Sequence, residues 1–479
     1  MKTLVVDKPD LKKASNRVKS KTEIVYFNDD NKKEMQSFLN GKKYFIKTYG
    51  CQANVRDGEY MSGLLEDFGL VQVENESSAD IILINTCAVR ENAEDKVYGE
   101  VGNLKNLYLK NKNILIGITG CMIEQPEILD FLLNTFSHVH LYVGTHELSY
   151  LVKYIYDALK NNERVVAVSS KQGEVYEDER VKRNNQFKAF VNVIYGCDKF
   201  CTYCIVPYTR GKERSRKFLD VIKECKKLVD DGYKEITLLG QNVNAYGKDL
   251  NEGKDFADLL EEVAKLGIPR LRFTTSHPWD FSKKMVDVIS KYDNIMKFIH
   301  LPVQSGDNEI LRKMGRRYTR ENYLDLVKYM KEKIPSLALS TDIIVGFPNE
   351  SEEQFLKTID LVNQVQYDSA FTFIYSPRKG TPAAKLEDSV PYKEKSRRFM
   401  MLVKVLEKSI SSSSLKMVGN VYSVLVDGIS KTDENMLSGY TESNKLVHFK
   451  GDKSLVGQIV PVKIIESHVY SLIGELVHE

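Results

Sequence analysis

The sequence predicts an α/β protein with three parts: an N-terminal parallel α/β sheet domain, a partial (β/α)6 barrel and a small antiparallel β-barrel at the C-terminus. Three patterns predict this class. Short apolar runs alternate with helical stretches to about residue 165, six further runs continue the alternation, and the last part of the chain holds short runs between glycines. A chain of 479 residues is also long enough for about three domains.

The composition excludes several classes of protein. Hydrophobic residues make up 42% of the chain and charged residues 28%, which is ordinary for a globular protein and excludes a disordered polymer. The net charge is only +3, so a nucleic-acid partner must be held by local patches. No apolar run reaches the roughly 18–20 residues of a membrane span and the N-terminus lacks a secretory signal, so we expect a cytoplasmic protein without a membrane partner.

Residues 1–40 mix Lys, Asp, Asn and Ser without periodicity, and we expect them to form a poorly ordered extension. The N-terminal domain is expected over residues 41–165. Its apolar runs 44–49, 81–86 and 114–119 are of strand length and have helical stretches between them, an alternation that is typical of a parallel sheet.

The second series of strand–helix units is expected over residues 180–414. Six units are fewer than the eight of a closed barrel, so the series predicts an open, partial barrel whose loops after the strands form one face. The runs expected to form its strands are Val191–Tyr195, Glu235–Leu239, Arg270–Thr274, Lys297–Val303, Ala338–Gly346 and Ala370–Tyr375.

A domain boundary is expected near residue 415. Residues 378–395 are rich in Pro, Gly and charge, and a helical segment to about residue 410 is followed by the serine tract 411–414. Residues 415–479 then hold four short alternating runs between glycines, which predict the small β-barrel. These runs are Val421–Val426, Lys445–Phe449, Ile459–Ile464 and Tyr470–Ile473.

Seven cysteines are a sparse and odd number, which argues against a disulfide scaffold and favours metal or redox use. Cys197, Cys201 and Cys204 form Cys-x3-Cys-x2-Cys directly after an expected strand. Three thiolates on one loop suit an iron–sulfur cube that leaves one iron open to a substrate. The alternatives are a zinc site, which lacks a fourth ligand nearby, and three inert structural thiols.

A second group of cysteines belongs to the N-terminal domain. Cys51, Cys87 and Cys121 are spaced by 36 and 34 residues, and each directly follows an expected strand. Because the carboxyl ends of parallel strands lie at one edge of a sheet, we expect the three sulfurs to meet there and to hold a second cluster. The alternative is that they are scattered small hydrophobic residues. Cys225, alone in a helical stretch, is expected to be packed in the core.

The cysteine loop after the first strand of a six-unit barrel resembles the radical S-adenosylmethionine (SAM) superfamily. A three-cysteine α/β domain, this barrel and a terminal barrel similar to the RNA-binding TRAM domain, in that order, resemble the methylthiotransferase family over about residues 42–479. Four motifs are most similar to its tRNA-modifying, MiaB-type branch: TYGCQAN from Thr48, NTCAVRE from Asn85, IVPYTRGKERSR from Ile205 and FIYSPRKGTPAA from Phe373.

The resemblance implies methylthiolation of adenine C2 in N6-isopentenyladenosine next to the tRNA anticodon. It implies two 4Fe-4S clusters, with the two cysteine trios as catalytic and metal-ligating residues, and two SAM molecules. One SAM supplies the methyl group and the other the 5′-deoxyadenosyl radical that activates C2–H. Residues that end the barrel strands on the same face are expected to bind SAM: Gly240, Gln241, Asn242, Ser276, Gln304, Ser305 and Asp342. His277 and His300, on that face, are expected to be hydrogen-bonded barrel residues rather than bases.

The partners implied are the tRNA anticodon stem-loop, an electron donor of the flavodoxin or ferredoxin type, and a sulfur or cluster donor; we expect the chain to act as a monomer. Nine Lys and Arg against two acids within residues 182–217, and five Arg and Lys within 312–320, predict contacts to phosphate, with a solvated surface as the alternative. Residues 415–479 carry six Lys, eight acids and no Arg, so RNA binding there depends on the resemblance alone.

Two alternatives share this architecture: methylthiolation of N6-threonylcarbamoyladenosine in tRNA, and methylthiolation of an aspartate in a ribosomal protein. The clusters do not separate them, because the difference lies in the lining of the substrate pocket. An alternative of another class is an RNA-binding electron carrier. Three-cysteine sites argue against it, since electron carriers fill every iron with protein ligands.

Overall fold

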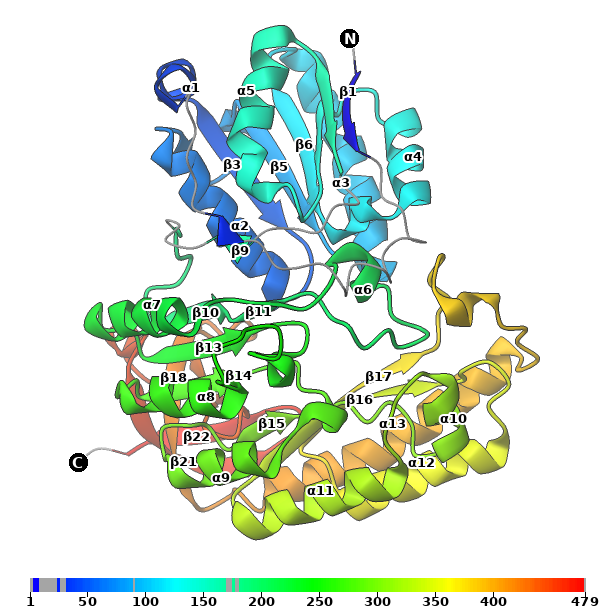
Figure 1. Cartoon of the computed structure of the whole chain (residues 1–479). Coiled ribbons are helices and arrows are strands. Elements are labelled where there is room, and N and C mark those ends of the chain that lie inside the picture. The colour runs from blue at the N-terminus through cyan, green and yellow to red at the C-terminus, as the bar shows by residue number, and fades with distance from the viewer. Residues whose placement is uncertain are drawn as a thin grey trace.

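The computed structural model of the chain describes residues 3–7, 24–25, 32–88, 91–168, 175–176 and 181–477. Figure 1 shows the N-terminal α/β domain on one side of the barrel, with the short helix α6 (Val206–Thr209) at their junction. The C-terminal strands pack against the barrel on another side. Within the described part of the chain, no helix is long and apolar enough to cross a membrane.

The N-terminal domain is built on a parallel sheet of seven strands in the order β1-β8-β7-β6-β5-β3-β4. The strands are β1 (Thr3–Asp7), β3 (Lys43–Thr48), β4 (Val71–Gln72), β5 (Ile81–Thr86), β6 (Leu115–Gly120), β7 (Leu141–Val143) and β8 (Arg164–Ala167). Every residue of β5 and β6 is buried, because helices cover both faces of the sheet. The three predicted strands correspond to β3, β5 and β6, which lie side by side.

Five helices cover this sheet: α1 (Lys32–Leu39), α2 (Gln52–Asp67), α3 (Glu91–Lys110), α4 (Pro126–Thr135) and α5 (Leu151–Asn161). Helices α1, α2 and α5 pack on one face and α3 and α4 on the other. Helix α1 corrects the prediction of a poorly ordered segment 1–40, since Met35 and Leu39 are buried in the domain core. The rest of that segment lies outside the described residues apart from β1 and β2 (Ile24–Val25), which pairs with β9 (Val175–Tyr176).

The partial barrel has the six parallel strands that the sequence predicts. They form two groups, β10 (Lys188–Asn192), β13 (Glu235–Leu239) and β14 (Arg270–Phe273), then β15 (Phe298–His300), β16 (Ala338–Val345) and β17 (Ser369–Ile374). A bridge between Leu271 and Ile295 links the groups, and β10 and β17 are the two end strands. The predicted first strand 191–195 is wrong in one respect: β11 (Ile194–Tyr195) leaves the barrel and pairs antiparallel with β12 (Arg214–Ser215).

The outer helices of the barrel are α7 (Phe218–Asp230), α8 (Phe256–Lys265), α9 (Lys283–Lys291), α10 (Asn308–Lys313), α11 (Arg320–Lys333), α12 (Glu352–Val365) and α13 (Tyr392–Leu415). Their apolar faces and the outward side chains of the strands form the largest core of the molecule. Cys225 on α7 is fully buried in this core, which confirms that it is packed. Helix α13 continues through the serine tract and ends at Leu415, next to the predicted boundary. Ser413 donates to Asp368 and Ser414 accepts from Lys445.

The terminal barrel is closed, in the order β18-β19-β20-β22-β21. Its strands are β18 (Val421–Ile429), β19 (Leu437–Thr441), β20 (Leu446–Phe449), β21 (Ile459–Ser467) and β22 (Leu472–Leu476). The predicted antiparallel barrel is correct for every pair except β20 and β22, which run parallel. Strand β19 was not predicted because it has the sequence LSGYT, with a single apolar residue other than tyrosine.

Two arginines attach the terminal barrel to the partial barrel. Arg270 is 1% exposed, and its guanidinium donates to the backbone oxygens of Tyr440 and Ser423, both at 2.7 Å. Arg272 donates to the backbone oxygen of Thr441 at 3.0 Å. Both arginines lie on the short strand β14, which begins at Arg270, so the terminal barrel covers the amino ends of the barrel strands and leaves their carboxyl ends to the cysteine loop.

We expect Arg270→Met to loosen the terminal barrel. The change removes the charged donor of these two backbone oxygens, and a hydrogen bond to a charged group contributes about 1.5–3 kcal/mol. Hydrogen exchange should become faster in β18 and β19. The control is Lys188→Met, which removes a partly exposed ion pair with Asp427 (2.6 Å) and should cost less than about 1 kcal/mol. Equal protection of β18 in the wild type and in Arg270→Met would contradict this role.

Candidate cluster and SAM sites

The first cysteine trio lies at the carboxyl edge of the N-terminal sheet. Cys51, Cys87 and Cys121 follow β3, β5 and β6, which are neighbours in the sheet. The register pairs Thr48 with Asn85 and Thr86 with Gly120, so the three chains leave the sheet at the same level. The structure therefore brings together the three residues that the sequence singled out.

Backbone geometry holds these three loops close together. Gly120 has a φ of 98°, and a Cβ there would lie 2.3 Å from the carbonyl oxygen of Thr86, so only glycine fits. Asn54 donates to that same oxygen at 2.9 Å. Asn85 donates to the backbone oxygen of Asn54 at 2.7 Å. Each loop is thus fixed by its neighbour before any ligand binds.

Arg210 of the barrel reaches into the first trio. Its Nε donates to Cys121 Sγ at 2.9 Å, and its two terminal nitrogens lie 2.6 and 3.3 Å from the carboxylate of Asp57 on α2. A hydrogen bond with Cys87, and the charge of Arg210, lower the pKa of Cys51 to about 5, whereas burial raises that of Cys121 to about 11. Metal ligation requires thiolates, and the arginine favours them here.

The second trio lies on the loop between β11 and α6. Gly196 has a φ of 73°, and a Cβ there would lie 1.9 Å from the carbonyl oxygen of Lys212, so a glycine begins the loop. The amide of Cys204 donates to Cys201 O at 3.0 Å. Burial and the neighbouring Cys201 raise the pKa of Cys204 to about 12, and burial, Glu213 and the other two thiols raise that of Cys197. The three cysteines share one loop of eight residues, 197–204.

A second buried arginine serves this loop. Arg316 is 7% exposed and donates to Pro302 O at 2.6 Å, to Tyr318 Oη at 2.9 Å and to Cys201 Sγ at 3.6 Å. Each trio therefore has one guanidinium beside one of its sulfurs. Sequence reasoning missed both roles, because it assigned Arg210 and Arg316 to basic runs that face RNA.

The two trios face each other across the junction of the domains. Ala88, next to Cys87, packs with Cys121 against Ile205 and Tyr208, which follow Cys204. The hydroxyl of Thr145 donates to Thr209 O of α6 at 2.8 Å, and α6 lies at the junction in Figure 1. The carboxyl edge of the N-terminal sheet thus meets the cysteine loop of the barrel.

The thiol donor sets fit the iron–sulfur clusters that the resemblance implies. Among the described residues, no three His, Cys, Asp or Glu side chains converge on a point where one metal ion would be held. A cube takes one thiolate per iron, so its sulfur ligands need to surround it rather than converge. Each of the two loop-borne trios has a neighbouring guanidinium and offers three cysteine sulfurs to such a cluster.

Three of the residues expected to bind SAM carry buried polar atoms without a partner. These atoms are Asn242 Oδ1, Ser276 Oγ and Gln304 Oε1, and they follow the carboxyl ends of β13, β14 and β15. Buried polar groups are normally hydrogen-bonded, so three orphans at one end of a barrel fit a polar ligand that supplies their partners. Asp198 Oδ1 and His277 Nε2 are orphaned in the same way, and sequence reasoning did not assign them to SAM.

The other expected SAM residues have protein partners. A Cβ on Gly240 would lie 2.4 Å from Ile194 Cγ2, so this glycine permits close packing. Gln241 accepts from the amide of Gly196. Ser305 is fully buried, and its hydroxyl lies 3.5 Å from Thr358 Oγ1 on α12. The structure thus places Ser305 in the support behind the strand ends rather than at an open position.

The two histidines are engaged within the barrel. His300 lies 3.1 Å from Ser340 Oγ through Nδ1 and 3.4 Å from Asp342 Oδ1 through Nε2. His277 Nδ1 accepts from the amide of Trp279 at 3.3 Å. Burial, and then Arg316, lower the pKa of His277 to about 2, so its ring is neutral.

Several members of the two basic runs that were predicted to face phosphate are paired with acids of this chain. In the first run, Arg210 binds Asp57 inside the domain junction. Other cations of both runs pair with acids from distant elements or the next helical turn: Arg183 with Glu59, Lys199 with Asp280, Arg216 with Glu224, Lys313 with Glu309 and Arg320 with Asp360. Part of the local excess of positive charge is thus paired with acids within the fold.

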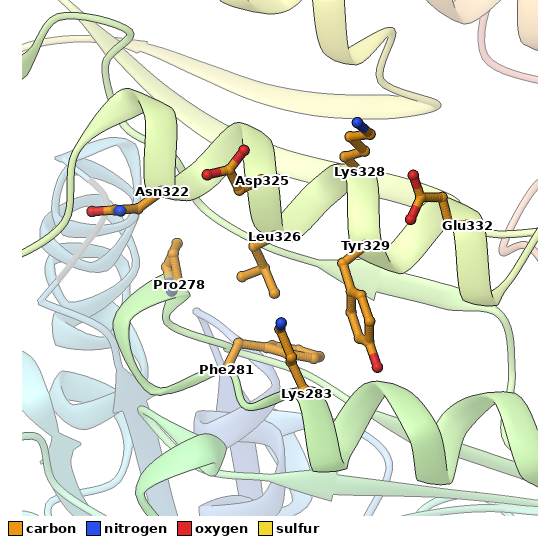
Figure 2. A pocket seen from close by; sticks show the side chains of 9 residues that line it. All are labelled: Pro278, Phe281, Lys283, Asn322, Asp325, Leu326, Lys328, Tyr329 and Glu332. Carbon is orange, nitrogen blue, oxygen red and sulfur yellow. The ribbon is translucent and has the colours of Figure 1, made fainter.

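A groove of about 430 Å³ lies away from both trios, between α11 and the segment that leads into α9 (Figure 2). It is lined by Pro278, Phe281, Lys283, Asn322, Asp325, Leu326, Lys328, Tyr329 and Glu332. None of these is a cysteine or an expected SAM residue. The groove is therefore not the site described above.

Comparisons with known proteins agree with this architecture. The radical SAM superfamily matches residues 191–362, the uncharacterized protein family UPF0004 residues 43–144, and the TRAM domain residues 415–477. The radical SAM methyltransferase TsrM from Kitasatospora setae, solved with cobalamin and a [4Fe-4S] cluster, has a TM-score of 0.54 at 13% identity, covering 72% of this chain and 74% of that chain. Fold and cysteine loop together define a radical SAM protein.

Relatives at much higher identity give the family. A tRNA-2-methylthio-N(6)-dimethylallyladenosine synthase of Staphylococcus epidermidis is 49% identical over 478 residues, 99% of this chain and 92% of that protein. One of Anoxybacillus flavithermus is 50% identical over 474 residues, 98% of this chain and 89% of that protein. The chain belongs to the family of tRNA-2-methylthio-N(6)-dimethylallyladenosine synthases.

We expect Asp57→Asn to destabilise the domain junction. It leaves the buried charge of Arg210 without its partner, and breaking a buried ion pair in this way costs about 3–5 kcal/mol. The midpoint of urea unfolding under anaerobic conditions measures the loss. Asp157→Asn removes an exposed helical pair with Lys153 (2.9 Å) and serves as the control, at less than about 1 kcal/mol. Equal midpoints for the two variants would rule out a structural role for the Arg210–Asp57 pair.

Proposed function

We propose that this chain methylthiolates C2 of N6-dimethylallyladenosine, also called N6-isopentenyladenosine, next to the anticodon of tRNA. The observation that carries the proposal is the opposition of the two trios at the domain junction. A group carried by one trio is then within reach of a substrate activated at the other. The family to which the chain belongs, with its radical SAM and TRAM domains, supports the same function.

The six cysteines of the trios would hold the two 4Fe-4S clusters, and Asn242, Ser276 and Gln304 would contact SAM. When bound, the clusters and SAM supply the sulfur, the methyl group and the radical that a C2–H bond requires. The protein orients the substrate and excludes water from the junction, where Ala88 and Ile205 are buried. Arg210 and Arg316 hold one sulfur of each trio and keep the loops in place.

The partners follow from this function. The tRNA anticodon stem-loop is the substrate, a flavodoxin or ferredoxin type of protein delivers electrons, and a separate donor restores sulfur or the clusters. We propose that the chain acts as a monomer in the cytoplasm, where tRNA is modified. The terminal barrel, at the amino ends of the barrel strands, would bind a part of the tRNA away from the reacting base.

Cells that lack this chain should lose the 2-methylthio group from tRNA and accumulate N6-isopentenyladenosine, because the step before methylthiolation is intact. Nucleoside analysis of total tRNA by mass spectrometry measures both species. Complementation with the wild-type chain should restore the product. The proposal would be contradicted by an unchanged level of isopentenyladenosine together with loss of 2-methylthio-N6-threonylcarbamoyladenosine or of the modified ribosomal aspartate. Such a result would identify one of the two alternative substrates.

The trios should differ in their tasks. We expect Cys197→Ala to abolish reductive cleavage of SAM and methylthiolation together. Cys51→Ala should abolish methylthiolation while 5′-deoxyadenosine is still formed, since the barrel trio is intact. Cys225→Ser, which lies in the core away from both trios, tests whether loss of any thiol has the same effect. If Cys51→Ala and Cys197→Ala lose SAM cleavage equally, the division of labour is wrong.

A further inference from the structure

Two phenylalanines on the last barrel strand are exposed where a core is expected. Phe371 is 56% exposed and Phe373 45%, and both lie on β17, an end strand of the partial barrel. Large apolar side chains in an exposed cluster mark a binding surface more often than an accident of packing. The question is which surface of the barrel they belong to.

The strand register places both rings on the inner face of the barrel. Phe371 pairs with Asp342 and Phe373 with Ile344 on β16, and paired residues of a parallel sheet share a face. Ile343, between Asp342 and Ile344 on β16, is fully buried in the core under the helices. Phe371 and Phe373 lie on the other face of the sheet and therefore face the inside of the barrel. The ring centroids of Phe371 and His300 lie 6.0 Å apart, which agrees with this assignment.

This inner-face patch, formed by Ile344, Phe371 and Phe373, lies close to the candidate reaction site. The chain that leaves β17 returns to the cysteine loop, where the amide of Ala383 donates to Thr202 O at 2.8 Å. On the way, Arg378 lies 3.7 Å from Glu94 of the N-terminal domain. The carboxyl end of β17 therefore leads into the junction between the two trios.

We propose that the inner-face patch receives the dimethylallyl group on N6 of the substrate adenine and thereby selects the prenylated base. The inference rests on the proposed function. In adenine, N1 lies between C2 and C6, and the alkyl group is attached to C6 through N6. The ring can therefore hold C2 at the junction while the alkyl group extends away from C2. An apolar branched chain gains by leaving water for a surface of two aromatic rings and an isoleucine.

The charges on this face favour the alkyl group over the two alternative substrates. Asp342 lies beside Phe371 in the register, and its carboxylate would repel the carboxylate of a threonylcarbamoyl group or of an aspartate. The nearest ring, His300, is already held by Asp342 and Ser340. Arg272, on β14, is held by Glu235 at 2.8 Å and by Thr441. The cation nearest in sequence to the patch, Arg378, lies 3.7 Å from Glu94 and is thus already beside a carboxylate.

The test compares the affinity of the anaerobically reconstituted full chain for two anticodon stem-loop RNAs, one with N6-isopentenyladenosine and one with unmodified adenosine. Fluorescence anisotropy of labelled RNA gives both dissociation constants. We expect the wild type to bind the prenylated RNA about tenfold more tightly or better, as for an alkyl group in an apolar pocket. In the double variant Phe371→Ala and Phe373→Ala the ratio of the two constants should fall to about one.

Two further variants keep the test decisive. Leu356→Ala removes an apolar side chain that is 42% exposed on α12, outside the barrel, and should keep the wild-type ratio. Phe371→Asn, measured after circular dichroism shows a folded chain, should lower the ratio several-fold even if the double variant does not fold. An unchanged ratio in Phe371→Asn, with a wild type that prefers and methylthiolates prenylated RNA, overturns this inference and leaves the proposed function intact. A wild type that instead prefers threonylcarbamoylated RNA overturns both.

Discussion

The buried ion pair between Arg210 and Asp57 is the interaction on which the arrangement of the molecule depends. Arg210 belongs to the barrel and Asp57 to α2 of the N-terminal domain, and the same guanidinium donates to Cys121. Parallel sheets bind ligands at the carboxyl ends of their strands, so each domain has its site at one end. Because the pair joins the domains at those ends, the two sites lie next to each other at the domain junction.

The opposite end of the barrel is closed by different means. Arg270 and Arg272 bind backbone oxygens of the terminal barrel and secure it at the amino ends of the strands. The carboxyl end and the inner face remain for SAM and for a base. Polar orphans at the ends of β13 to β15 and aromatic rings on β17 divide that face into a polar half and an apolar half. The polar half suits SAM, which has a charged amino acid moiety, and the apolar half suits an alkylated base.

The sequence predicts the six strands of the barrel and the gathering of Cys51, Cys87 and Cys121, because each cysteine directly follows a strand and parallel order sets the common edge. It does not predict the Arg210–Asp57 contact, since 153 residues separate the partners and no local pattern links them. The same limit applies to the basic runs, because acids distant in the sequence pair with several of their cations, as Glu59 does with Arg183 and Asp360 with Arg320. Strand β4 was missed because it has only two residues, both exposed.

The central claim is that six cysteines form two separate three-thiolate sites that meet at one junction. The most direct measurement is the iron and acid-labile sulfide content of the wild-type chain after anaerobic reconstitution, with Mössbauer spectroscopy to identify the cluster type. Two cubes give about eight irons per chain, all in the signals of 4Fe-4S clusters. A saturated content of about four irons would show that one trio holds no cluster, and it would contradict the claim.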